Sequence, residues 1–143
     1  MLRILLPFAL FALAFGCTCI PSNPNNQKRY CSSDYVGVFK ILNQTGDEST
    51  FTLIYTAEVV EVFKSKSGLQ KGSTIEIRTR GDTDQCGVLG LVEGSVYLLN
   101  GAESNNVYNV SLCPLYRNIL WSFVSEYLKK DLANGSFEPC PLK

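Results

Sequence analysis

Six cysteines constrain this chain more than any other feature of its sequence. They stand at positions 17, 19, 31, 86, 113 and 140 of 143 residues. An even number of cysteines in so short a chain is typical of a disulfide framework formed in an oxidising compartment. Zinc sites usually place their ligands in close pairs, and here only Cys17 and Cys19 are close to each other. The pattern therefore favours three disulfides over a zinc site.

The spacing of the cysteines limits how they pair. Side chains two residues apart on an extended segment point the same way, so a Cys17–Cys19 bond would be strained. Three cysteines lie near the N-terminus and three lie far downstream. We therefore expect the first group to bond to the second, which would clamp an extended segment, Cys17–Pro21, onto the rest of the domain. The sequence alone does not choose among the individual pairings.

The first sixteen residues have the pattern of a secretory signal peptide. One arginine precedes an apolar stretch over residues 4–15, which is shorter than the roughly 20 residues that a membrane-spanning helix needs. Small residues permit cleavage after Ala14 or after Gly16, and the second cut would leave a mature domain of residues 17–143. A bacterial lipoprotein junction at Cys17 is an alternative, but lipidation would leave an odd number of cysteines. We expect a secreted, extracellular protein that is not inserted into a membrane.

Composition excludes several functions. The 13 basic and 13 acidic side chains balance, whereas a nucleic-acid-binding protein needs an excess of lysine and arginine. Histidine is absent, which rules out Ser-His-Asp and Cys-His catalysis and every imidazole metal site. No lysine or carboxylate pair stands out as a substitute, so we do not expect an enzyme or a cofactor of its own.

Three triplets match the signal for N-glycosylation. They begin at Asn43, Asn109 and Asn134. In a secreted protein such asparagines are candidate glycan sites, and any that carry a glycan should be exposed.

The hydrophobic pattern predicts five strands. The expected strands are Tyr35–Leu42, Thr50–Phe63, Ser73–Arg80, Ser95–Asn100 and Val107–Cys113, with turn clusters between them. Thr74–Arg80 alternates between apolar and polar residues, as a strand with one face in water should.

A helix is expected at each end of this series. Asn23 and Pro24 fit the cap and the first residue of a short helix that runs toward Cys31. Apolar residues at three- and four-residue spacing over 119–128 predict one helix of about four turns, ended by Asn134-Gly135. The result is a mainly β fold: a small, closed, five-stranded barrel of the oligonucleotide/oligosaccharide-binding (OB) type, with three disulfides.

Several motifs in the sequence resemble those of the tissue inhibitors of metalloproteinases. The motifs are Cys17-Thr18-Cys19-Ile20-Pro21, Cys31-Ser32-Ser33-Asp34-Tyr35-Val36, Val62-Phe63-Lys64, Cys86-Gly87, Tyr97-Leu98-Leu99 and Leu112-Cys113. Each is weak alone, but the order and spacing of all six cysteines is specific. The resemblance covers nearly the whole mature chain and corresponds to the netrin-like, N-terminal domain of that family.

The resemblance implies a fold and a disulfide pairing. The fold is the same five-stranded barrel that the strand pattern predicts. The implied bonds are Cys17–Cys86, Cys19–Cys113 and Cys31–Cys140.

The resemblance also implies a function, the inhibition of zinc metalloproteases. The α-amino nitrogen and carbonyl oxygen of Cys17 would bind the catalytic zinc of the target, and Thr18 would enter its main specificity pocket. The further implied contacts in the protease cleft are Cys19, Ile20, Pro21, Asp84, Gln85 and Cys86. The expected partners are secreted or cell-surface zinc metalloproteases, and we expect a monomeric glycoprotein of the extracellular matrix.

A second hypothesis is a netrin-like module that binds an extracellular protein without inhibiting proteases. Such modules usually follow other domains, so a Cys-x-Cys motif that begins the mature chain favours the inhibitor. A mature protein that starts at Phe15 would favour the binding module.

Overall fold

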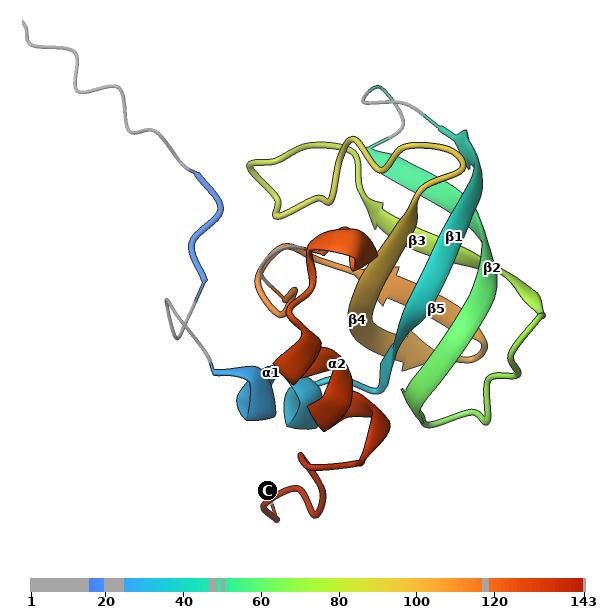
Figure 1. Cartoon of the computed structure of the whole chain (residues 1–143). Helices are drawn as coiled ribbons and strands as arrows, with labels where there is room; N and C mark the ends of the chain where they lie inside the picture. Colours follow the sequence, from blue (N-terminus) through green and yellow to red (C-terminus); the bar gives the residue numbers. More distant parts are fainter. Residues whose placement is uncertain (1–15, 20–24, 47–48, 50, 117–118, 143) are drawn as a thin grey trace, which may run out of the picture.

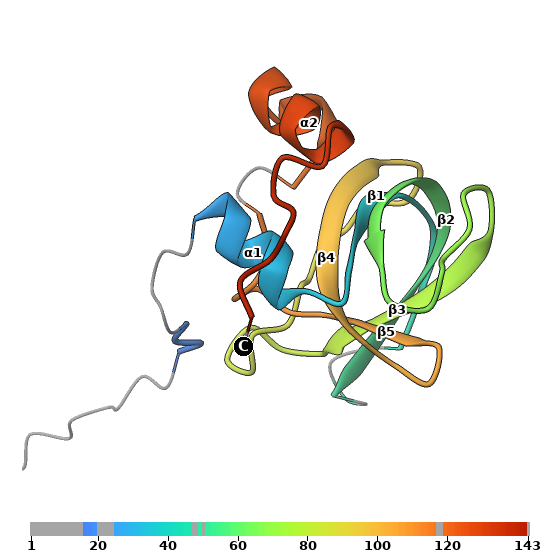
Figure 2. The same cartoon turned by 90° about the horizontal axis from the view of Figure 1, so that it is seen from below.

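The structure is a computed structural model, and it describes residues 16–19, 25–46, 49, 51–116 and 119–142. Its elements, in chain order, are α1 (Asn26–Ser32), β1 (Tyr35–Thr45), β2 (Thr52–Ser65), β3 (Thr74–Arg80), β4 (Val96–Ser104), β5 (Val107–Val110), the 3-10 helix η2 (Trp121–Phe123) and α2 (Glu126–Ala133). The five strands form a closed barrel, and both α-helices lie outside it on the side of β4 (Figures 1 and 2). The predicted mainly β barrel with two helices and three disulfides is confirmed.

The barrel has the strand order β1-β2-β3-β5-β4 and closes between β1 and β4. All neighbouring strands are antiparallel except β3 and β5, whose parallel pairing covers only Ile77 with Tyr108 and Arg78 with Asn109. The pairing of β1 with β2 shifts register at three places, the first between Val36 and Gly37. Such bulges bend and twist long strands, which lets them close into a barrel.

The inside of the barrel is the main core. Strand β2 alternates, with Leu53, Tyr55, Ala57 and Val59 buried and their neighbours half-buried. The ring of Tyr35 packs edge-on against two other rings, those of Phe39 and Tyr108, with centroids 5.8 and 5.4 Å away. The full set of buried residues is Tyr35, Phe39, Ile41, Leu53, Tyr55, Ala57, Val59, Ile77, Val88, Leu91, Tyr97, Leu99, Tyr108, Val110 and Leu115.

A second core lies between the helices and the outer face of the barrel. It contains Tyr30, Val36, Leu98, Tyr116, Val124, Leu128 and Leu132. Because helices cover this face, β1 is buried at five successive positions, from Tyr35 to Phe39, and does not alternate there. None of the helices in the described part of the chain combines the length and apolar character needed to cross a bilayer.

The N-terminal helix starts later than the sequence predicts. Its cap is Asn25, whose side-chain oxygen accepts a hydrogen bond from the backbone N–H of Lys28 at 2.8 Å. The predicted cap and first residue, Asn23 and Pro24, lie outside the described residues. The prediction chose the wrong asparagine because Pro24 fits the first helical position, whereas the cap bond is made by Asn25.

The prediction of one four-turn C-terminal helix is wrong. After the single turn of η2, the backbone is extended at Val124, with φ −67° and ψ 131°. The helix α2 then begins with Ser125 as its cap, because the Ser125 hydroxyl accepts a hydrogen bond from the backbone N–H of Leu128 at 3.3 Å. The break buries Val124 and Leu128, while Phe123 and Tyr127, expected on the same apolar face, are 72% and 86% exposed.

The hairpin between β4 and β5 is tighter than predicted. Strand β4 continues to Ser104, so only Asn105 and Asn106 remain as the turn, and their φ angles are 50° and 61°. Two successive residues with positive φ are the requirement of a type I′ turn, which asparagine tolerates. Strand β5 ends at Val110, three residues before the expected Cys113.

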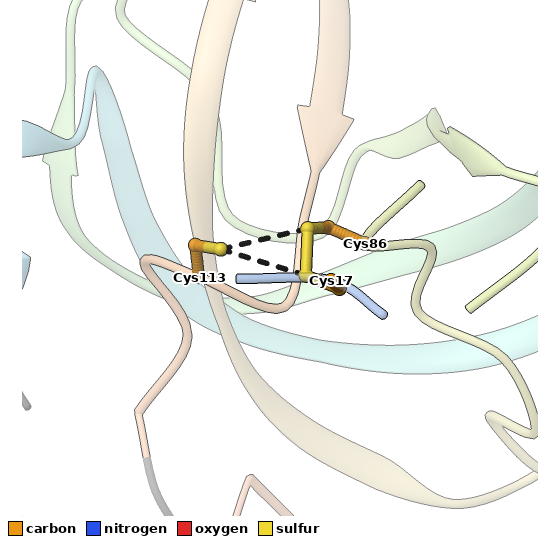
Figure 3. Close-up of side chains that lie close together, drawn as sticks. All are labelled: Cys17, Cys86 and Cys113. Carbon is orange, nitrogen blue, oxygen red and sulfur yellow. Dashed lines mark hydrogen bonds between the residues drawn. A yellow bond between two sulfur atoms is a disulfide. The ribbon is translucent and has the colours of Figure 1, made fainter. Parts of the chain in front are cut away.

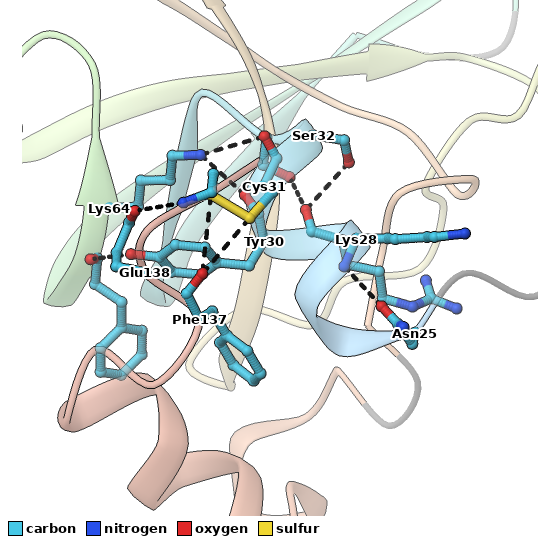
Figure 4. The surroundings of a disulfide bond; sticks show 12 residues. Asn25, Lys28, Tyr30, Cys31, Ser32, Lys64, Phe137 and Glu138 are labelled. Atoms are coloured by element: carbon cyan, nitrogen blue, oxygen red, sulfur yellow. Dashed lines mark hydrogen bonds between the residues drawn. A yellow bond between two sulfur atoms is a disulfide. The ribbon is translucent and has the colours of Figure 1, made fainter. Parts of the chain in front are cut away.

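The Cys31–Cys140 bond ties α1 to the segment after α2, with Cα atoms 5.4 Å apart. Figure 4 shows the packing around it. The rings of Tyr30 and Phe137 lie 5.5 Å apart, and the Tyr30 hydroxyl donates a hydrogen bond to the carbonyl of Phe63 at 3.1 Å. Burial, and then the nearby charge of Glu138, raise the pKa of Tyr30. The bond therefore joins α1 to the C-terminal segment, and Tyr30 connects this pair to β2.

Candidate functional site

The N-terminal strip, defined here as residues 17–19, is fastened to the barrel by two adjacent disulfides. Cys17 bonds to Cys86 and Cys19 bonds to Cys113, with Cα separations of 5.0 and 5.1 Å. The sulfur of Cys113 lies 3.7 Å from that of Cys17 and 3.6 Å from that of Cys86 (Figure 3). Together with Cys31–Cys140, these are the pairings that the family resemblance implies.

The close cluster formed by the sulfurs of Cys17, Cys86 and Cys113 has the spacing of a metal site but lacks its chemistry. All six cysteines lie in the described part of the chain, and each is disulfide-bonded. A metal-binding cysteine acts as a thiolate, so these sulfurs are structural.

Asp82 shapes the loop that presents Cys86. Its two carboxylate oxygens accept hydrogen bonds from the backbone and side-chain N–H groups of Gln85, at 2.7 and 3.0 Å. Its carbonyl accepts a hydrogen bond from the backbone N–H of Gly87 at 2.9 Å. Sequence reasoning missed Asp82. The signal that could have found it is an aspartate three residues before a glutamine, since aspartate side chains often close turns in this way.

Cys86 is held from its other side as well. Its carbonyl accepts hydrogen bonds from the backbone N–H of Leu112 at 3.0 Å and from the hydroxyl of Ser111 at 3.3 Å. Its φ is 63°, in the left-handed region that a residue with a β-carbon seldom adopts. At the next residue, Gly87, an added β-carbon would overlap the carbonyl oxygens of Arg80 and Asp82. The loop therefore has little freedom to move relative to the segment that carries Cys113.

Some of the predicted contact residues are exposed in the structure, and others lie outside the described residues. Thr18 is exposed between the half-buried Cys17 and Cys19, and its hydroxyl donates a hydrogen bond to the carbonyl of Gly16 at 3.3 Å. Asp84 and Gln85 are exposed on the loop that the Cys17–Cys86 bond joins to the strip. Ile20 and Pro21, also predicted as cleft contacts, lie outside the described residues.

The three candidate glycosylation asparagines are all exposed. Asn43 lies on β1, Asn109 on β5, and Asn134 is the C-terminal cap of α2.

The arrangement is a strip held by two disulfides on an OB-type barrel, with the small hydroxyl side chain of Thr18 exposed between two half-buried cysteines. This combination defines a class of small, disulfide-bonded barrel proteins whose N-terminal segment is covalently fixed to the barrel. A sequence model described as tissue inhibitor of metalloproteinase matches residues 16–141. The chain therefore belongs to the tissue inhibitor of metalloproteinase family, and it corresponds to the netrin-like, N-terminal domain of that family. A search of curated proteins returns no match to the sequence.

Proposed function

We propose that this chain is a secreted inhibitor of zinc metalloproteases that binds the catalytic zinc of its target through the first residue of the mature protein. Family membership supports inhibition of metalloproteinases as the general function. The observation that carries the mechanism is the pair of adjacent disulfides, which fixes Cys17 and Cys19 to the barrel and leaves Thr18 exposed between them.

The atoms that reach the zinc are backbone atoms. Cleavage after Gly16 would give Cys17 a free α-amine, while its sulfur is already bonded to Cys86. The amine nitrogen and the carbonyl oxygen of Cys17 would then occupy the zinc and displace the bound water that the protease uses as its nucleophile. Only a neutral amine can ligate a metal. An ordinary α-amino pKa of about 7.7–8.0 makes deprotonation inexpensive at neutral pH, and proton release should accompany binding.

The rest of the strip supplies affinity and selectivity. Thr18 would enter the main specificity pocket, where its hydroxyl would lie near the catalytic glutamate of the protease. Cys19, Ile20 and Pro21 would follow the cleft, with Asp84 and Gln85 beside them. Two disulfides hold the strip before it meets the protease, so less conformational entropy is lost on binding.

Secreted or cell-surface zinc metalloproteases are the proposed partners, bound one to one by a monomeric inhibitor. The zinc belongs to the target, and the inhibitor needs no cofactor.

Two measurements on the secreted protein test this function. Mass spectrometry should find a mature N-terminus at Cys17 with an unmodified amine, and the protein should inhibit catalytic domains from a panel of zinc metalloproteases. Thr18→Ala should change the ranking of the panel, whereas Thr74→Ala, an exposed threonine on β3, should leave it unchanged. A start at Phe15 together with no inhibition at micromolar concentration would reject the proposal in favour of the netrin-like binding module.

A further inference from the structure

A groove opens next to the loop that carries Cys86, where β3 and β5 separate. Their parallel pairing ends at Arg78 and Asn109, although β3 continues to Arg80 and β5 to Val110. The separation leaves a hollow of about 430 Å³, whose lining includes Arg78, Arg80, Gln85, Asn109 and Ser111.

Two arginines, Arg78 and Arg80, are the charged residues of the groove lining. Arg78 and Arg80 are both exposed, and no carboxylate contributes to the lining among the described residues. Arg78 has one ion-pair partner in that part of the chain, Glu76, at 3.8 Å with both side chains well exposed. Exposed pairs of this kind contribute little, so the guanidinium groups remain available to an incoming anion.

The groove also continues into the proposed inhibitory surface. Gln85 lines the groove and directly precedes Cys86, which is bonded to Cys17. Ser111 also lines the groove, and the Ser111 hydroxyl donates a hydrogen bond to the carbonyl of Cys86. A protease that holds the strip in its cleft would therefore bring the rim of that cleft over the groove.

We propose that this groove binds an acidic segment of the target metalloprotease at the rim of its active-site cleft. This inference rests on the proposed function. Two guanidinium groups in a short hollow match one or two carboxylates, since arginine pairs with carboxylates in a bidentate geometry. A short acidic segment fits better than a long sulfated polysaccharide, because only the long chain would have to extend past Asp82 and Asp84 on the adjoining loop.

The test is a charge-reversal variant, Arg78→Glu/Arg80→Glu, with Lys40→Glu as the matched control. Lys40 is an exposed cation on β1, outside the groove. Each protein is assayed against catalytic domains of zinc metalloproteases that carry acidic residues beside the cleft, at low and at high salt. We expect the double variant to associate about tenfold more slowly at low salt, with a smaller difference at high salt. The control should stay within about twofold of the wild-type rate.

Each other outcome contradicts a specific part of the account. If the wild type inhibits and the double variant matches it at low salt, the groove proposal is wrong while the proposed function stands. If the wild type inhibits no protease, both are wrong. Retention on heparin that requires the two arginines, with unchanged inhibition, would assign the groove to a polyanion. A glycan found on Asn109 would cover the groove and exclude docking.

If charge reversal lowers the thermal stability, the single variant Arg80→Gln replaces the double variant. We then expect association at low salt to be about threefold slower than for the wild type.

Discussion

Removal of the Cys31–Cys140 bond is expected to lower the stability of the domain without disturbing the N-terminal strip. This bond joins α1 to the segment after α2, whereas the strip is held by the other two bonds. We therefore expect the variant Cys31→Ala/Cys140→Ala to fold, to unfold at a lower urea concentration, and to keep its inhibitory activity.

The expected loss follows from the covalent network. A bond that spans 109 residues would by itself stabilise the fold by about 4.8 kcal/mol on the chain-entropy relation. In this protein the Cys19–Cys113 bond shortens the loop, because Cys19 and Cys31 are 12 positions apart and Cys113 and Cys140 are 27 positions apart. The shortest covalent route is therefore about 39 residues, which corresponds to about 4 kcal/mol.

The assay is urea unfolding followed by circular dichroism and by the fluorescence of Trp121, the single tryptophan. Phe137→Ala is the control, because it removes the ring that packs on Tyr30 and keeps the disulfide. A loss in the free energy of unfolding below about 1 kcal/mol would refute the loop argument, given the estimate above. Loss of inhibition by a folded variant would refute the claim that the strip is held independently.

Three further predictions concern other parts of the fold. Gly87→Ala should lower the free energy of unfolding by about 1–3 kcal/mol in urea and weaken inhibition, because its β-carbon overlaps two backbone oxygens; an unchanged protein would contradict this. Ser125→Ala removes the cap bond to Leu128 and should cost about 1 kcal/mol without affecting inhibition. Burial, and then the charge of Tyr108, raise the pKa of the Tyr35 hydroxyl in the folded protein. As the pH rises, the unfolded chain therefore loses the Tyr35 proton at a lower pH than the folded protein does. The free energy of unfolding should therefore fall above about pH 10, by about 1.4 kcal/mol per pH unit for this group, and Tyr35→Phe should remove that share of the slope.

The strands were predictable because burial repeats locally along them. The alternation of β2 matches the apolar pattern of its sequence, and five strands, the expected number, form the closed barrel. Disulfide pairing depends on contacts between residues 69 to 109 positions apart, so it required the family resemblance. Arg78 and Arg80 could not be singled out from the sequence for the same reason, because the groove forms where β3 and β5, which are distant in sequence, separate.

The break before α2 was harder to predict because two signals compete in the same segment. The apolar spacing from Ile119 to Leu128 favours a continuous helix. Ser125 instead caps a new helix, and the extended backbone at Val124 places that side chain in the second core. Tertiary packing decides between the two, and spacing along the sequence does not report it. Asp82 was missed for a similar reason, since its function depends on the turn it closes.

The central claim is that the free amine of Cys17 binds the zinc of a target protease. The most direct test compares the mature protein that begins at Cys17 with the same protein carrying one alanine ahead of Cys17. Both are first shown to contain the three disulfides and to have equal thermal stability, and both are then assayed against one zinc metalloprotease catalytic domain. The account predicts that the added alanine abolishes inhibition, because it converts the amine to an amide and displaces the strip from the cleft. Equal inhibition by the two proteins would show that this amine does not bind the zinc.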